Sequence, residues 1–197
     1  MNKVFKTLVM TGLALLFGVM STNVTAFAQE YEGVYEAPSV YEEKHAIYDM
    51  PTVDDLDGNG AKYDYLVSGT DQYNDLLATV AVRNNIDPVF LKVLMSVESC
   101  GVVSVKSGSY YGPFQISSSF GFDNNLMMSD AEYAMQCACD VINCKANAVK
   151  NCNLEPSIYY VAKFYNGSSA YGKKVSTIYE DLTDGDSNVS IYLDERE

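Results

Sequence analysis

The chain has 197 residues, of which 48% are hydrophobic and 20% are charged. This composition supports one domain with a folded core and excludes disorder throughout. Its 26 Asp and Glu residues outnumber its 13 Lys and Arg residues, for a formal charge of −13, and such an acidic protein is not expected to bind nucleic acid.

The first 28 residues have the pattern of a cleavable secretory signal peptide. Lys3 and Lys6 precede an apolar stretch over residues 8–20, and small residues stand at positions 26 and 28. We therefore expect a secreted or periplasmic protein that begins at Gln29. An uncleaved membrane anchor is the alternative, but the apolar stretch is short for a span. No later apolar run reaches about 20 residues, so no membrane span is expected in the mature chain.

Acidic residues gather at both ends of the mature chain. Residues 29–70 contain many acids and spaced tyrosines without a helical or strand period, which is typical of a linker or partly ordered arm. We expect this arm to contact the domain or a partner in an envelope or secretion assembly. Residues 183–197 form a second acidic segment, a solvated tail.

Between these ends, the apolar spacing predicts a mainly α domain over residues 71–182. Asp71 is expected to cap a first helix, and Asp87-Pro88 has the residue types that open a second. Residues 101–121 are rich in Gly and Ser, and a small β ribbon is expected within 104–122. Ser129 or Asp130 is expected to cap a third helix. The predicted helices cover residues 71–84, 88–99, 130–147, 156–164 and 171–182.

Glu98 stands near the end of the predicted helix 88–99. Residues three, four and seven positions before it share its helical face, and they are Met95, Leu94 and Leu91. A carboxyl group on such a face is desolvated, so its pKa rises and it stays protonated as a general acid. The alternative is a Glu at a helix end without a catalytic role.

Three short motifs follow in order. They are Glu98-Ser99, then Gly-Pro-Phe-Gln-Ile over 112–116, then Phe-Tyr-Asn-Gly over 164–167. Because these three motifs occur in this order, residues 71–182 resemble the catalytic domain of soluble lytic transglycosylases. That domain is related to goose-type lysozyme and has a lysozyme-like fold. The chain departs from the family where Pro113-Phe114 replaces Leu-Met and where tyrosines precede Gly112, so the detailed shape of the substrate cleft is expected to differ.

The resemblance implies cleavage of the β-1,4 bond between N-acetylmuramic acid and N-acetylglucosamine in peptidoglycan strands, without a cofactor. Glu98 would act first as acid and then as base, and the product would carry a 1,6-anhydro ring. Gln115 would hold an N-acetyl group, since its amide offers a donor and an acceptor. Tyr165 would form a hydrogen bond near Glu98 and help to hold it. Further candidates for the substrate cleft are Asn166, Ser107 and Tyr111.

Two other functions remain open at this stage. A hydrolytic muramidase of the same fold usually needs a second carboxylate, for which Asp123 is the nearest downstream candidate. A non-catalytic module would bind glycan or an envelope assembly through the cleft or the arm. The combination of Glu98, Gln115 and Tyr165 favours catalysis.

The cysteines predict disulfides if the chain is exported. We expect one or two local bridges within residues 137–152, and the odd number leaves at least one thiol unpaired. A four-thiolate zinc site is an alternative, but the spacing is unusual for it. Cys100 as a nucleophile would need a histidine, and the chain has only His45. The five cysteines are Cys100, Cys137, Cys139, Cys144 and Cys152.

One short segment resembles the start of an EF-hand calcium loop. Asp55, Asp57 and Asn59 occupy alternating ligand positions, and Gly60 stands where the loop turns sharply. The twelfth position is Leu66, where a bidentate Glu is required. The segment is therefore a weak calcium candidate, and an ordinary turn is the alternative.

Overall fold

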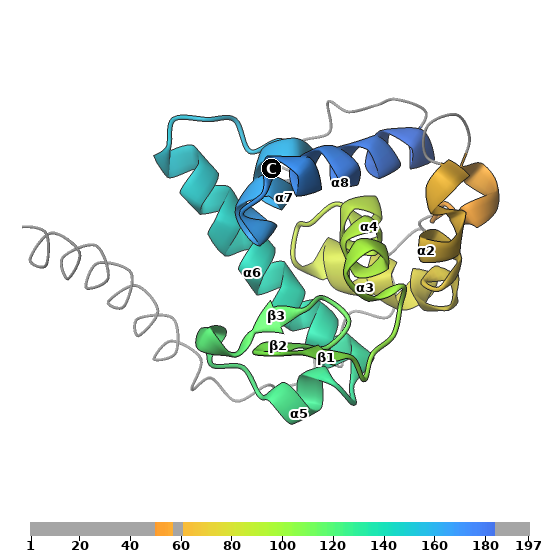
Figure 1. Cartoon of the computed structure of the whole chain (residues 1–197), viewed down its shortest axis with the longest axis horizontal. Helices are drawn as coiled ribbons and strands as arrows, with labels where there is room; N and C mark the ends of the chain where they lie inside the picture. The colour runs from red at the N-terminus through yellow and green to blue at the C-terminus, as the bar shows by residue number, and fades with distance from the viewer. Residues whose placement is uncertain (1–49, 57–60, 184–197) are drawn as a thin grey trace, which may run out of the picture. The chain divides into compact units, whose positions relative to one another are not determined.

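A computed structural model describes residues 50–56 and 61–183. Residues 50–56, 61–117 and 122–183 belong to one unit, which is mainly helical with a small antiparallel sheet (Figure 1). Residues 118–121, which contain the 3₁₀ turn η4 (Ser118–Phe120), are assigned to another. The predicted signal peptide, residues 29–49 of the arm and residues 184–197 of the tail lie outside the described residues. No helix in the described ranges has both the length and the hydropathy of a membrane span.

Folded structure begins before residue 71. Two 3₁₀ turns, η1 (Val53–Asp55) and η2 (Ala61–Tyr63), precede helix α2 (Asp64–Ser68). Four apolar side chains of this segment are buried, and α2 contacts helix α4 (Pro88–Ser99). The predicted boundary at residue 71 is therefore corrected to an earlier position. The segment has too few apolar residues for a recognisable period, and the buried ones are Met50, Leu56, Leu66 and Val67.

Helix α4 has the predicted bounds because local signals determine both ends. Asp87 Oδ1 accepts a hydrogen bond from the Phe90 backbone N at 2.8 Å, and Pro88 occupies the first helical position. Cys100 then adopts a left-handed conformation, with φ of 52°, that ends the helix. The helix contacts α2, α3 (Asn74–Arg83), α6 (Ala131–Asn151) and α8 (Ser169–Leu182), so it forms the centre of the core (Figure 1).

The helix predicted over 71–84 begins later than expected. Asp71 starts a 3₁₀ turn, η3 (Asp71–Tyr73), and α3 follows it at Asn74. Asp71 does not cap α3 because its carboxylate accepts a hydrogen bond from Lys92 Nζ, at 2.5 Å from Oδ1. Lys92 lies in the apolar run of α4 and is fully buried, and its ammonium also donates to Asn74 Oδ1 at 2.7 Å.

The predicted β ribbon is confirmed. It consists of β1 (Lys106–Ser107), β2 (Tyr110–Tyr111) and β3 (Ile116–Ser117), which pair antiparallel in that order. The turn after β2 requires Gly112, which has a φ of 73°. A Cβ atom there would lie 2.4 Å from the Met127 carbonyl oxygen, so only glycine allows this close approach.

The remaining predicted helices are confirmed with different ends. Helix α6 is capped by Asp130, not Ser129, since Asp130 Oδ1 accepts from the Tyr133 backbone N at 3.0 Å. Helix α7 (Ile158–Asn166) starts after Ser157 and not at Pro156, and Gly167 ends it with a φ of 87°. Helix α8 is capped by Ser168 and so starts before the predicted residue 171. A short helix, α5 (Asn124–Met127), was not predicted.

All five cysteines are free thiols in the structure. The structure contains no bridge within residues 137–152, most of which belong to helix α6, which continues to Asn151. Along a helix that rises about 1.5 Å per residue, Cys137 and Cys144 lie about 10 Å apart, beyond the roughly 7 Å limit for a disulfide.

Candidate active site

Glu98 lies on the last turn of α4, and close backbone packing fixes this turn. After Cys100 the chain passes against the end of α2 at Gly69. A Cβ atom on Gly69 would lie 2.0 Å from the Cys100 carbonyl oxygen, and one on Gly101 would lie 2.1 Å from the Gly69 carbonyl oxygen. Both glycines are therefore required for the contact that holds the end of α4.

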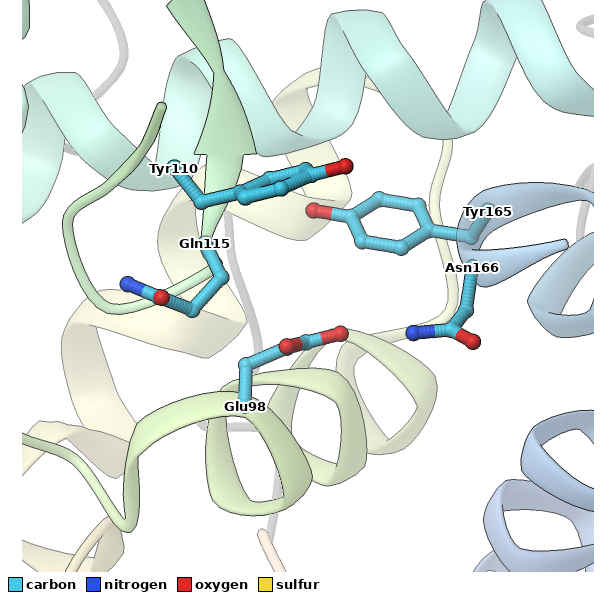
Figure 2. Close-up of a pocket in the computed structure, with 5 residues that line it drawn as sticks. All are labelled: Glu98, Tyr110, Gln115, Tyr165 and Asn166. Carbon is cyan, nitrogen blue, oxygen red and sulfur yellow. The ribbon is translucent and has the colours of Figure 1, made fainter. Parts of the chain in front are cut away.

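A pocket of about 240 Å³ opens beside Glu98 (Figure 2). Four of its lining residues are ones that the sequence analysis singled out, and they come from α4, the loop before β3 and the end of α7. The fifth, Tyr110 on β2, was not singled out as a cleft residue. The lining residues are Glu98, Tyr110, Gln115, Tyr165 and Asn166.

The environment of Glu98 has opposing effects on its protonation. Burial is the largest influence and raises the pKa of this carboxyl above its ordinary value. The Tyr171 hydroxyl donates a hydrogen bond to Glu98 Oε1 at 2.6 Å, and this bond and the positive charge of Lys174 lower the pKa. The net effect is a raised pKa, so a larger fraction of Glu98 stays protonated at neutral pH than in an exposed glutamate.

Tyr171, and not Tyr165, holds Glu98. The Tyr165 hydroxyl donates to the Phe114 carbonyl oxygen at 2.8 Å, so it ties α7 to the loop that carries Gln115. Burial raises the pKa of both tyrosine hydroxyls well above the ordinary value, and both therefore remain donors. Sequence reasoning missed Tyr171, since it lies on the first turn of α8 and only the packing of α8 against α4 brings it to Glu98.

Gln115 has a strained backbone and a partly committed side chain. Its φ of 46° is uncommon for a residue other than glycine and occurs at functional sites. Its Nε2 donates to the Gly112 carbonyl oxygen at 2.9 Å, and Figure 2 shows this nitrogen directed away from Glu98. Because the amide nitrogen is engaged, the carbonyl oxygen Oε1 is the atom that a ligand's N–H group can reach.

The structure does not bring Ser107 and Tyr111 to the pocket. Successive residues of a strand point to opposite faces, so Tyr110 lines the pocket while Tyr111 points elsewhere. Lys106 Nζ lies 4.9 Å from the centre of the Tyr111 ring. Ser107 is exposed on β1, where it pairs with Tyr110.

Asp123 does not supply a second carboxylate to the pocket. Its Oδ1 accepts hydrogen bonds from the backbone N atoms of Asn125 and Leu126, at 2.8 and 3.1 Å, and so caps α5. Of the described residues that line the pocket, Glu98 is the single acid. The site therefore has one carboxyl group that can exchange a proton with a bound ligand.

The described residues contain no cluster of three or more His, Cys, Asp or Glu side chains that could bind a metal ion. Of the weak calcium candidates, Asp55 accepts hydrogen bonds from the Thr52 backbone N at 2.6 Å and from Thr52 Oγ1 at 3.1 Å. Asp57, Asn59 and Gly60 lie outside the described residues.

Comparisons with protein families, with curated proteins and with solved structures find no match to this chain. The interpretation of the pocket therefore rests on its own geometry and chemistry.

Replacing Tyr171 by Phe is expected to raise the pKa of Glu98 further, because the hydroxyl that stabilises the carboxylate is lost. If Glu98 acts as a general acid, the basic limb of the pH–rate profile should move to higher pH. The measurement is the rate of glycan cleavage from acid to alkaline pH. If the variant is slower but the basic limb of its pH–rate profile lies at the same pH as in the unchanged protein, the role of Tyr171 is contradicted.

Proposed function

We propose that this protein is an exported peptidoglycan lytic transglycosylase with a lysozyme-like fold. The observation that carries the proposal is one half-buried carboxyl, Glu98, as the only acid among the residues that line a pocket with Gln115, Tyr165 and Asn166. These residues belong to the three motifs that resemble the family. The expected export rests on the first 28 residues.

In the first step, Glu98 protonates the oxygen that bridges N-acetylmuramic acid and N-acetylglucosamine. The bond from this oxygen to C1 of the muramic acid breaks, and N-acetylglucosamine leaves with the proton. The 2-acetamido oxygen of the muramic acid can stabilise the positive charge at C1. The raised pKa of Glu98 supports this step, since a general acid must hold its proton near the operating pH.

In the second step, ionised Glu98 takes the proton of the C6 hydroxyl. The C6 oxygen attacks C1 and closes the 1,6-anhydro ring, and Glu98 regains its proton. The Tyr171 hydroxyl and the Lys174 charge support this half of the cycle, since both stabilise the carboxylate. One group can therefore serve both steps because burial favours its acid form while these neighbours favour its base form.

The other pocket residues would orient the sugar. Gln115 Oε1 can accept a hydrogen bond from an acetamido N–H group. The Tyr110 ring offers an exposed apolar face against which a sugar can pack. Asn166, at the end of α7, can bond to hydroxyl or acetamido groups. No cofactor or metal takes part in these steps.

The proposal is tested by the mass of the products that the purified protein releases from peptidoglycan. A lytic transglycosylase should release anhydro-muropeptides, which are lighter by one water molecule than the products of hydrolysis. Products with reducing ends would instead indicate a muramidase. Binding to the wall without any release would indicate a non-catalytic module.

A further inference from the structure

A hydrogen bond between a tyrosine and a carboxylate joins α8 to each end of α4. At the end of α4, the Tyr171 hydroxyl donates to Glu98 Oε1 at 2.6 Å. At its beginning, the Tyr179 hydroxyl donates to Asp87 Oδ2 at 3.1 Å. Because Tyr171 lies early and Tyr179 late on α8, the two bonds show that the helices run in opposite directions along each other.

The two bonds differ in their surroundings. Tyr179 is 1% exposed and Asp87 is 7% exposed, so the bond at the start of α4 is shielded from water. Glu98 and Tyr171 are half-buried, and Glu98 also lines the pocket. A ligand in the pocket, or a change in the protonation of Glu98, can therefore disturb the Tyr171–Glu98 bond. Neither reaches the Asp87–Tyr179 bond, which can hold α8 throughout.

A shift of α8 along its own axis would break both bonds. Apolar burial is non-directional, so the core face of α8 favours contact with the core without selecting one lengthwise position sharply. A hydrogen bond fails when its donor and acceptor are more than about 3.5 Å apart, and a slide by one residue moves a helix by about 1.5 Å. The two tyrosine hydroxyls therefore fix the register of α8. The buried apolar positions of α8 are Gly172, Val175, Ile178 and Leu182.

Asp87 connects the start of α4 directly to α8. Its Oδ1 caps α4, and its Oδ2 accepts the bond from Tyr179, so the two oxygens of one carboxylate serve two helices. At the other end of α8, Ser168 caps the helix directly after the turn that follows α7. The first turn of α8, which carries Tyr171, is thus attached through α7, and its later turns are attached through Asp87.

From this arrangement we propose that Tyr179 is a positioning residue, which acts with Asp87 to hold α8 in the register that brings the Tyr171 hydroxyl to Glu98. The inference deepens the proposed function and rests on it, since Glu98 is the acid and the base of that reaction. Without the Asp87–Tyr179 bond, Tyr171 would bond to Glu98 less often. The carboxylate would then lose stabilisation, and the pKa of Glu98 would rise.

The groups that act directly on Glu98 lie closer to it than Tyr179. Tyr171 acts through a hydrogen bond, which depends strongly on the register of α8, whereas Lys174 acts through its charge, which depends less on exact geometry. An effect of Tyr179 on Glu98 should therefore pass through Tyr171. In the described part of the chain, the titratable side chains that face Glu98 are Tyr110 on β2, Tyr165 on α7, and Tyr171 and Lys174 on α8.

The titration of Glu98 in the free protein tests this inference without any need for catalysis. It is followed by NMR of the ¹³C-labelled carboxyl group. Tyr179→Phe removes the hydroxyl and keeps the ring in the core. We expect the midpoint of the Glu98 titration to move to higher pH, in the same direction as in Tyr171→Phe but less far. Adding Tyr179→Phe to the Tyr171→Phe protein should cause no further shift, because the bond through which Tyr179 acts is already lost.

Variants of Asp87 test the other side of the same bond. Asp87→Ser can still cap α4, but its side chain is too short to reach Tyr179, so it should shift the Glu98 midpoint as Tyr179→Phe does. Asp87→Asn is the matched control, since its amide oxygen can cap α4 and its amide nitrogen can donate to the Tyr179 hydroxyl oxygen. Its midpoint should stay near that of the unchanged protein. If circular dichroism shows that Tyr179→Phe is unfolded, Asp87→Ser provides the same comparison.

An unchanged midpoint in both Tyr179→Phe and Asp87→Ser would overturn the inference and would leave the Asp87–Tyr179 bond with a structural role alone. An undiminished shift when Tyr179→Phe is added to the Tyr171→Phe protein would also overturn it, because Tyr179 would then act independently of Tyr171. Failure of the proposed function has a different signature. In that case the midpoints move as expected, but the unchanged protein releases no anhydro product from purified peptidoglycan.

Discussion

Under the proposed mechanism, replacing Glu98 by Gln should reduce the release of anhydro-muropeptides by about 10³-fold or more, because in that mechanism the same side chain supplies and then removes the proton. Gln cannot donate a proton to the bridging oxygen or accept one from the C6 hydroxyl. Its amide oxygen can still accept the hydrogen bond from Tyr171, so the pocket should keep its shape. The measurement is the initial rate of product release from purified peptidoglycan, followed by mass spectrometry.

The same substitution should stabilise the protein at neutral pH. The pKa of Glu98 is raised in the folded state, so its contribution to stability is fully present below the ordinary pKa and is lost as the pH rises through the folded-state pKa. Gln carries no charge and avoids this loss. We expect a gain of roughly 0.5–2 kcal/mol in the free energy of unfolding at pH 7, which should disappear under acid conditions.

The matched control is Glu180→Gln, which makes the same change at an exposed position on α8. It should keep full activity and show no comparable gain in stability. If Glu98→Gln cleaves peptidoglycan at the rate of the unchanged protein, Glu98 is not the acid and the proposed mechanism fails. If it is inactive but unfolded by circular dichroism, the conservative variant Glu98→Asp provides the test, and it too should lose most activity because its carboxyl is drawn back by one methylene.

The second large effect concerns the buried ammonium of Lys92. Asp71→Ala should lower the free energy of unfolding by roughly 3 kcal/mol, because it removes the partner charge of a fully buried lysine. This loss of free energy lies near the lower end of the range for broken buried ion pairs, because the Asp71 side chain is 27% exposed. Burial already lowers the pKa of Lys92, so its loss of a proton would limit the penalty. The measurement is urea unfolding followed by circular dichroism.

Lys92→Met is the companion variant, because it replaces the ammonium with an apolar group of similar length. Its free energy of unfolding should be close to that of the unchanged protein, and the double variant with Asp71→Ala should recover most of the stability that Asp71→Ala loses. The two effects would instead add if the residues did not interact. Additive losses in the double variant would therefore contradict the ion pair.

Local sequence signals predicted the elements well where the signal and the structure lie within a few residues of each other. Asp87-Pro88 is an example, because the Asp side chain bonds to the Phe90 backbone three residues later. The prediction that Asp71 caps a helix was wrong because the partner of its side chain is distant in the sequence. Its carboxylate bonds to Lys92 on another helix, and no local pattern indicates a partner 21 residues away.

The mainly α fold, the β ribbon and four of the residues that line the pocket could be predicted from the amino-acid sequence alone; these residues are Glu98, Gln115, Tyr165 and Asn166. Apolar periodicity and motif order carry this information along the chain. The hydrogen bond from Tyr171 to Glu98 and the place of Tyr110 in the pocket could be found only from the three-dimensional packing. These contacts depend on how α8 packs against α4 and on which face of β2 turns towards the pocket, and both follow from the packing of distant segments rather than from neighbouring residues.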